Sequence, residues 1–138
     1  MGVDIEHESK PAPHIPPPLL PGKCAVYVFS LSMVFGRNCP AGGDRVLKVG
    51  KVGPNSEPRF RYQHYKRNSA QSTLAASLLN AKILWPYLGI ETLDDSSVGE
   101  WLKANTDRDH FLLNAGDREL LHTLEVFVRG LCSPVFEG

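Results

Sequence analysis

Several common sequence features are absent from this chain of 138 residues, and each absence excludes a class of protein. No run of about 18 apolar residues occurs, so no membrane span is predicted. The first ten residues, MGVDIEHESK, are polar and acidic, so we expect no secretory signal there and predict a cytoplasmic location. The three cysteines are odd in number and show no CxxC spacing, which disfavours a structural zinc site or a disulfide framework.

Net charge is also absent, because 15 Lys and Arg balance 15 Asp and Glu. This balance argues against a protein that coats nucleic acid non-specifically, but the charges are unevenly placed. The charged residues within 91–109 are mostly acidic, and those within 48–67 are mostly basic. The basic cluster consists of Lys48, Lys51, Arg59, Arg61, Lys66 and Arg67. We expect it to form one face of the protein, either a nucleic-acid surface or an ordinary solvated helix face.

The length and the apolar content of 42% fit a single globular domain. Residues 1–22 hold six of the eleven prolines, and proline favours extended polyproline II. We therefore predict an extended arm over 1–22, packed on the domain through Leu19 and Leu20, and a domain over 23–138. A ligand for a proline-binding module is the alternative for the arm.

Two strands are predicted first within this domain. Residues 24–31 are almost continuously apolar, as in a strand buried on both faces, and residues 45–52 form the second strand. The Gly- and Pro-rich stretch between them, FGRNCPAGGD, contains no helical pattern, so the two strands should pair antiparallel.

The rest of the chain alternates helical patterns with one more strand. Helices are predicted over 56–66 with Ser56 as N-cap, over 73–88 with Ser72 as N-cap, over 97–104, and over 118–131 with Asp117 as N-cap. Pro86 should kink or end the second helix. Residues 110–113 are predicted to form a third strand. The sequence therefore predicts an α/β (α+β) fold, with a small antiparallel three-stranded sheet flanked by helices and a helical insertion over about 68–109.

The last helix carries one apolar stripe with a carboxylate at its margin. The stripe consists of Leu120, Leu121, Leu124, Phe127, Val128 and Leu131. At about 100° per residue, Glu125 lies beside Leu121, at the border of the core. A half-sheltered charge needs a partner, either a metal ion or a basic side chain in an ordinary salt bridge. Glu119 has a simpler role, because it complements the helix dipole in the first turn.

Two strand residues and one helix add further polar candidates. Tyr27 lies inside the first apolar strand, and Lys48 lies between Leu47 and Val49 in the second, where it should extend to solvent or face a cleft. The helix over 56–66 interleaves arginines with aromatic residues, and arginine matches the geometry of phosphate. A core tyrosine, a sheet-edge lysine and aromatic anchors for the helix are the alternative interpretations.

These residues, taken in order, resemble the GIY-YIG nuclease family. Ala25-Val26-Tyr27 resembles the first half of the signature, and Lys48-Val49-Gly50 resembles the second half. Further matches are a family arginine at Arg59 or Arg61, a family histidine at His64, and a family glutamate at Glu125 followed by Pro134. The matches span residues 24–136.

The resemblance implies a metal-dependent endonuclease that hydrolyses DNA phosphodiesters, with RNA as a further possible substrate. Glu125 would bind one Mg²⁺ or Mn²⁺. Tyr27 would act as general base or orient the water, if Lys48 lowers its pKa. Arg59 or Arg61 would neutralise the developing charge on the phosphate, and His64 would bond a phosphate oxygen or assist proton transfer. Beside this catalytic set, Lys51, Lys66 and Arg67 would contact nucleic acid.

Departures from the family pattern leave two alternatives open. Ala25 replaces a glycine, Lys48 a tyrosine and Glu137 an asparagine. The first alternative is a degenerate domain that binds nucleic acid or a protein without cutting. The second is an interaction module unrelated to nucleic acid. A nuclease of this size would read DNA through its own helical insertion, act as a dimer, act with a partner protein, or recognise DNA structure rather than sequence. In the nuclease, Tyr27, Lys48, an arginine and Glu125 should converge within about 10 Å.

Overall fold

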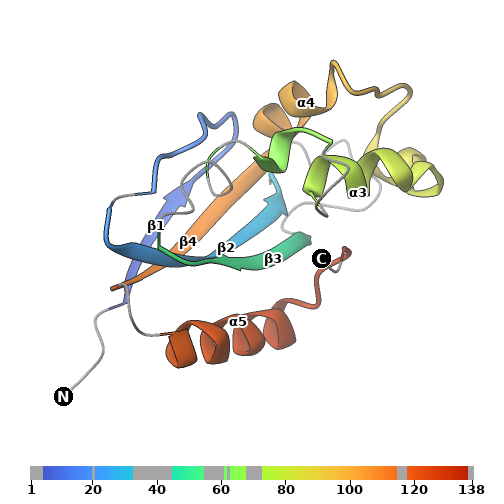
Figure 1. Cartoon of the computed structure of the whole chain (residues 1–138). Helices are drawn as coiled ribbons and strands as arrows, with labels where there is room; N and C mark the ends of the chain where they lie inside the picture. The colour runs from blue at the N-terminus through green and yellow to red at the C-terminus, as the bar shows by residue number, and fades with distance from the viewer. Residues whose placement is uncertain are drawn as a thin grey trace.

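The computed structural model describes residues 5–19, 21–32, 45–54, 61, 63–67, 73–114 and 118–136. Over these ranges the chain has an α+β fold, built on a four-stranded antiparallel sheet with the order β1-β4-β2-β3 (Figure 1). The strands are β1 (Glu6–Lys10), β2 (Lys23–Leu31), β3 (Val46–Val52) and β4 (Thr106–Asn114). Among the described strands, β1 and β3 lie at the two edges of the sheet.

Helices cover both faces of this sheet. The described helices are η1 (Gln63–Tyr65), α3 (Leu74–Asn80), η2 (Lys82–Leu88), α4 (Val98–Asn105) and α5 (Arg118–Cys132), where η marks a 3₁₀ helix. Figure 1 shows α5 running beneath the sheet, whereas α3 and α4 lie on the opposite side near one end. The sheet therefore separates two helical layers.

The alternation of side chains along β2 divides the core in two, because successive residues of a strand point to opposite faces. Cys24, Val26 and Val28 pack with Leu121 and Val128 of α5, and we call this side the α5 face. Ala25, Tyr27, Phe29 and Leu31 pack with α3, η2 and α4, and we call this side the Tyr27 face. Each predicted site residue on the sheet belongs to one of these two faces.

The predicted pairing of the first two strands is confirmed, since β2 and β3 are antiparallel. The predicted third strand over 110–113 is part of β4, which begins earlier, at Thr106. The predicted insertion over 68–109 therefore extends too far, because its last four residues belong to the sheet. The sequence did not indicate a strand there, because the buried residues Thr106, Arg108 and His110 are polar and alternate with charged residues.

The prediction of three strands was wrong by one, because the arm contributes β1. Its sequence, EHESK, has no apolar alternation, so nothing in it indicates a strand. It forms because the open edge of β4 offers hydrogen-bond partners along the whole length of β1. Leu19 is buried in the core, as predicted for the arm, whereas Leu20 lies outside the described residues.

The helix predicted over 73–88 is two elements. Thr73, rather than Ser72, is the N-cap of α3, and its side chain accepts a hydrogen bond from the Ala76 amide. The α-helix ends at Asn80, and Pro86 lies inside the 3₁₀ helix η2, not at the break. The Trp85 indole donates to the Leu78 carbonyl at 2.9 Å, which holds the two elements together.

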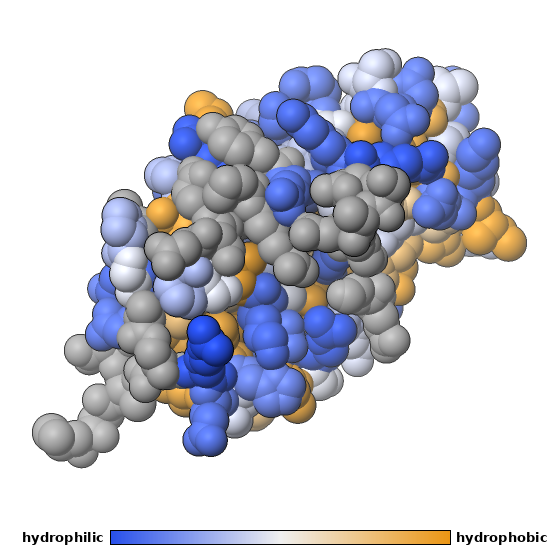
Figure 2. All heavy atoms as spheres, in the orientation of Figure 1, coloured by the Kyte–Doolittle hydropathy of each residue, from blue (hydrophilic) through white to orange (hydrophobic). Residues whose placement is uncertain are grey.

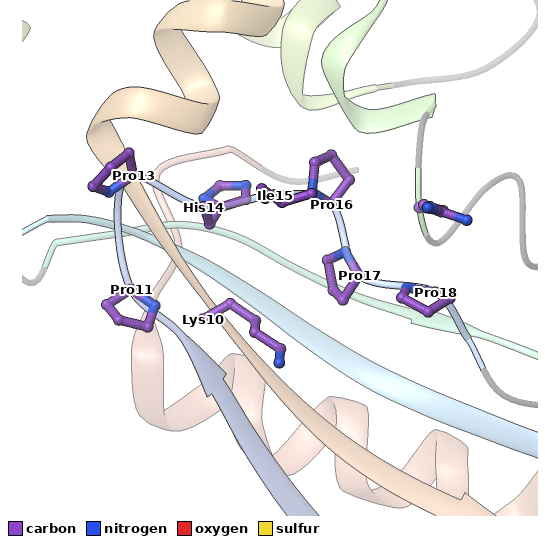
Figure 3. Close-up of a pocket in the computed structure, with 9 residues that line it drawn as sticks. Lys10, Pro11, Pro13, His14, Ile15, Pro16, Pro17 and Pro18 are labelled. Carbon is purple, nitrogen blue, oxygen red and sulfur yellow. The ribbon is translucent and has the colours of Figure 1, made fainter.

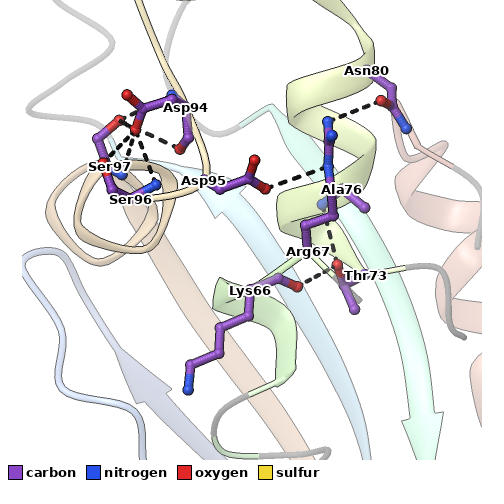
Figure 4. A network of polar contacts seen from close by, with 9 residues as sticks. All are labelled: Lys66, Arg67, Thr73, Ala76, Asn80, Asp94, Asp95, Ser96 and Ser97. Carbon is purple, nitrogen blue, oxygen red and sulfur yellow. Dashed lines mark hydrogen bonds and ion pairs between the residues drawn. The ribbon is translucent and has the colours of Figure 1, made fainter. Parts of the chain in front are cut away.

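The predicted helices over 97–104 and 118–131 correspond to α4 and α5. Before α4, the Asp94 carboxylate accepts hydrogen bonds from the hydroxyls and the amides of Ser96 and Ser97, and these bonds, those of the hydroxyls most, lower its pKa (Figure 4). The helix predicted over 56–66 lies largely outside the described residues. Within it, Arg61 is helical and Gln63–Tyr65 forms η1. The caps Ser56 and Asp117 also lie outside them.

Several large apolar side chains reach the surface, among them residues of η2 and α5. On the face shown in Figure 2 hydrophilic residues predominate, and apolar ones gather toward the end where α3 lies. Ile83 and Tyr87 of η2 are exposed, as are Val126, Phe127 and Leu131 of α5. No described helix is long and apolar enough to cross a membrane.

Candidate functional site

The two halves of the expected signature lie side by side in the sheet. Tyr27 of β2 is directly opposite Gly50 of β3, and its phenol lies over the glycine. The Tyr27 ring contacts the rings of His64, at a centroid distance of 4.4 Å, and Phe29, at 5.9 Å. Only 2% of Tyr27 is exposed. Gly50 is therefore needed for space, because the hydrogen at its Cα leaves room for the ring.

Lys48 lies on the Tyr27 face as well. It pairs with Phe29, next to a bulge at which Ser30 pairs with Val46. At a bulge two residues oppose one, so Leu47 and Lys48 both occupy the stretch opposite Phe29. Lys48 is buried, with 2% exposed, which corrects the expectation that it extends to solvent or faces a cleft.

Glu125 lies on the other face of the sheet, in two ion pairs. Its carboxylate is 3.9 Å from the Lys51 ammonium and 3.6 Å from the Arg129 guanidinium, with 14% of the side chain exposed. Lys51 pairs with Val26, so it points to the α5 face. Arg129 also donates to the Val49 carbonyl at 2.8 Å. This is the salt-bridge alternative that the sequence left open for Glu125.

The expected convergence of the phenol, the two cations and the acid is therefore absent from the described residues. Tyr27 and Lys48 belong to one face, and Glu125 to the other. The reason is the period of two along β2: Val26 and Val28 turn to α5, so the residue between them must turn away from it. Arg59 lies outside the described residues.

The described residues of the basic cluster do not lie on one face. Lys48 is buried, and Lys51 points to the α5 face, where its ammonium lies 2.7 Å from Nδ1 of His122. Arg67 pairs with Asp95, at 3.6 Å, and with the Asn80 side chain, so it joins the acidic stretch (Figure 4). Lys66 is exposed, and Arg61 is half-buried.

His64 is a buried residue of η1. Its ring lies between the side chains of Tyr27 and Phe29, with the Phe29 centroid at 5.1 Å. It therefore belongs to the aromatic core of the Tyr27 face. A histidine in this position packs against the sheet rather than facing solvent.

Sequence reasoning missed a chain of buried polar residues on the Tyr27 face. Arg108 of β4, fully buried, donates from Nε to His110 and from Nη1 to Tyr65, both at 3.0 Å. The Tyr65 hydroxyl contacts Nε2 of His14 at 2.5 Å. At the other end, Nδ1 of His110 lies 2.8 Å from the Glu8 carboxylate. We call this set, with His14 at one end and Glu8 at the other, the Arg108 relay.

The partners of the relay define its protonation. His14 Nδ1 faces the Thr106 carbonyl at 2.7 Å, which can only accept, so Nδ1 carries the proton and Nε2 accepts from the Tyr65 hydroxyl. His110 accepts from Arg108 at Nε2, so its Nδ1 donates to Glu8. Both imidazoles are neutral, and the His110 ring lies between the charges of Arg108 and Glu8.

Burial has the largest effect on the titration of the relay. Burial and, after it, the positive charge of Arg108 lower the pKa of His14 to about 4, although the hydrogen bond to the Thr106 carbonyl opposes this shift. The same two causes lower the pKa of His110 to about 2. Burial also raises the pKa of Tyr65, although the Arg108 guanidinium opposes this. With both nitrogens engaged, His14 offers no free base, so the relay holds the structure rather than moving protons.

A pocket of about 410 Å³ opens beside the relay, under the proline-rich segment (Figure 3). Residues 10–18 curve over it, and we call this segment the proline arch. Figure 3 shows the Lys10 side chain inside the curve of the arch. Arg61 and His14 also line the pocket. Two cations therefore face a concave surface whose remaining described walls are His14, Ile15 and prolines.

A divalent ion held by the Glu125 carboxylate alone, as the resemblance implies, stays a prediction. Within the described residues, no three His, Cys, Asp or Glu side chains gather as metal ligands could. The Glu125 carboxylate faces two cations, and a further positive ion would have to compete with both.

Comparisons with protein-family models, with curated proteins and with solved structures each found no match. The resemblance to the GIY-YIG family therefore remains a prediction from the quoted residues. The class that the fold defines is an α+β domain with a four-stranded antiparallel sheet between two helical layers.

Proposed function

We propose that this protein is a GIY-YIG-like domain that binds nucleic acid without cutting it. One observation carries the proposal: Lys10 and Arg61 face the same pocket, on the sheet face opposite the acid expected to hold a metal ion. Arginine and lysine are the side chains that bind phosphate, arginine in a bidentate way and lysine as a point charge. The arrangement supports phosphate binding, and among the described residues Tyr27 and Glu125 lie on opposite faces of the sheet.

Salt dependence tests this proposal. A fluorescent single-stranded DNA should bind the full chain, with log K falling by about 0.7 per decade of salt for each phosphate contacted. Replacing Lys10 with alanine should weaken binding and reduce the slope by about that amount. Lys82→Ala is the matched control, because Lys82 is an exposed lysine of η2 outside the pocket. If the DNA does not bind, or if its affinity does not change with salt concentration, nucleic-acid binding is contradicted.

A second candidate is the metal-dependent endonuclease that the resemblance implies. The observation in its favour is the β2–β3 register, which sets Tyr27 over Gly50 and so brings the two halves of the signature together. Supercoiled plasmid incubated with Mg²⁺ or Mn²⁺ tests it. Nicking that disappears in Glu125→Ala but persists in Glu119→Ala, an exposed acid of the same helix, would establish the enzyme. If the unaltered chain leaves the plasmid intact, the endonuclease is excluded and the domain that binds without cutting is retained.

A further inference from the structure

The proline arch has few backbone N–H donors. Five prolines lie between residues 11 and 18, and none has a backbone N–H. Their rings, together with Ile15, present flat apolar surface to the pocket. Ile15 is 83% exposed, which is unusual for an isoleucine and leaves its side chain available for contact. This wall suits the face of a planar ring better than a strongly polar group.

The arch is held in place from behind. The His14 amide donates to the Lys103 carbonyl at 2.9 Å, and the Ala12 amide donates to the Asp107 carboxylate at 2.7 Å. The His14 ring is fixed by Thr106 and Tyr65, as described for the relay. A wall anchored at these points is preformed, so a ligand would not bear the cost of ordering it.

Lys10 and Arg61 bring positive charge to the lining of the pocket. Lys10 pairs with Arg108 in the sheet, so both side chains belong to the Tyr27 face. No described carboxylate lies within 4.0 Å of the Lys10 ammonium, since Glu8 on the same strand is engaged by His110. Arg61 adds a second cation from the chain segment before η1. An anionic group would therefore be attracted to the pocket.

We propose that this pocket binds one unstacked nucleotide, with its phosphate between Lys10 and Arg61 and its base against the proline arch. The inference rests on the proposed function and names the unit of nucleic acid that the protein recognises. The volume of about 410 Å³ lies in the range of small-molecule sites. Single-stranded nucleic acid offers such units, because its bases can leave the stack and its phosphates carry the charge.

A nucleoside monophosphate provides the simplest test. ¹H–¹⁵N NMR titration of the full chain with deoxyadenosine 5′-monophosphate should shift the amide signals of Lys10 and Ile15. Deoxyadenosine, which lacks the phosphate, should bind about tenfold more weakly, as expected when one charge-assisted contact is lost. Lys10→Ala should weaken binding of the monophosphate by a similar factor, and Ile15→Ser should weaken it severalfold.

Matched controls come from η2. Lys82→Ala and Ile83→Ser alter the same residue types at exposed positions outside the pocket, and Ile83 is 83% exposed, as Ile15 is. Both controls should bind the monophosphate like the unaltered chain. Equal affinity of the Lys10 and Ile15 variants with their controls would overturn the pocket assignment, as would preferential binding of an acidic peptide.

The two proposals fail in different ways. In one outcome, single-stranded DNA binds with a steep salt slope, and neither Lys10→Ala nor Ile15→Ser changes its affinity. This result would overturn the nucleotide pocket but retain nucleic-acid binding. Loss of both DNA and monophosphate binding in the unaltered, folded chain would overturn both. A 5′-phosphorylated oligonucleotide of RNA in parallel with DNA shows which sugar the site accepts.

Discussion

Gly50 and Tyr27 show how a single residue can be required by a partner on another strand. A Cβ added at Gly50 would lie 2.9 Å from Cε2 of Tyr27 and closer still to its Cζ and hydroxyl oxygen. The ring has little freedom to retreat, because His64 and Phe29 lie against it. The glycine backbone is not in the left-handed region, so the requirement is space alone.

Gly50→Ala should therefore lower the free energy of unfolding by about 1–3 kcal/mol, the usual cost of overpacking a core. Gly53→Ala is the control, because nothing lies within 4 Å of its added Cβ. Urea denaturation measures both. If the two variants are equally stable, Tyr27 does not lie over Gly50 as described.

Tyr65 is a second residue whose value comes from its partners. Its hydroxyl accepts from Arg108 and donates to His14, so Tyr65→Phe leaves two buried groups short of a partner. We expect a loss of about 1–3 kcal/mol in the free energy of unfolding. Tyr87→Phe removes the same atom from an exposed ring and should change stability by less than about 0.5 kcal/mol. A loss in both variants would contradict a specific role for the relay.

At the scale of elements, α5 is rotated about its own axis, so that only part of its apolar stripe faces the sheet. Leu121 and Val128 are buried, whereas Phe127 and Leu131, predicted to face the core, are 62% and 70% exposed. On a helical wheel with about 100° per residue, this rotation brings Glu125 toward the sheet. The ion pairs with Lys51 and Arg129 compensate the sheltered carboxylate and so stabilise the rotated position.

The two sides of α5 should respond differently to truncation. Leu121→Ala should cost about 2–5 kcal/mol, because it opens a cavity against the sheet. Phe127→Ala removes more atoms but should leave the free energy of unfolding nearly unchanged, because most of its side chain already contacts solvent. Thermal unfolding of both variants measures the difference, and the reverse order would mean that α5 docks through its other side.

At the scale of the whole molecule, stability should depend on pH through the two relay histidines. Their pKa values, about 4 for His14 and about 2 for His110, lie below the value of 6.5 expected in the unfolded chain. Between these values the unfolded state binds more protons than the folded state. The stabilisation from neutral imidazoles is therefore complete above pH 6.5, and it is lost as pH falls toward 4 and then toward 2.

Urea denaturation at pH 7.5, 6 and 5 should show this loss. Below pH 6.5 the free energy of unfolding should fall by at most about 2.7 kcal/mol per pH unit, the limit for two protons. His14→Gln should be less stable at pH 7.5 but lose stability less steeply, because one titrating group is gone. A stability that stays constant from pH 7.5 to 5 would show that these imidazoles are not held neutral by burial.

Much of the local structure followed from the sequence, because hydrophobic periodicity acts over neighbouring residues. The strands over 24–31 and 45–52, their antiparallel pairing and the last two helices were predicted in this way. The alternation along β2 also implied that Val26 and Tyr27 point to opposite faces. The fold class was therefore within reach of the sequence.

Only the tertiary structure decided which residues meet. It recruited Glu6–Lys10 into the sheet, assigned α5 to the face opposite Tyr27, and split the basic cluster between two faces. It also assembled the relay from Glu8, His14, Tyr65, Arg108 and His110. The physical reason is that a buried polar group needs a partner, and that partner is chosen by packing between segments that are far apart in the chain.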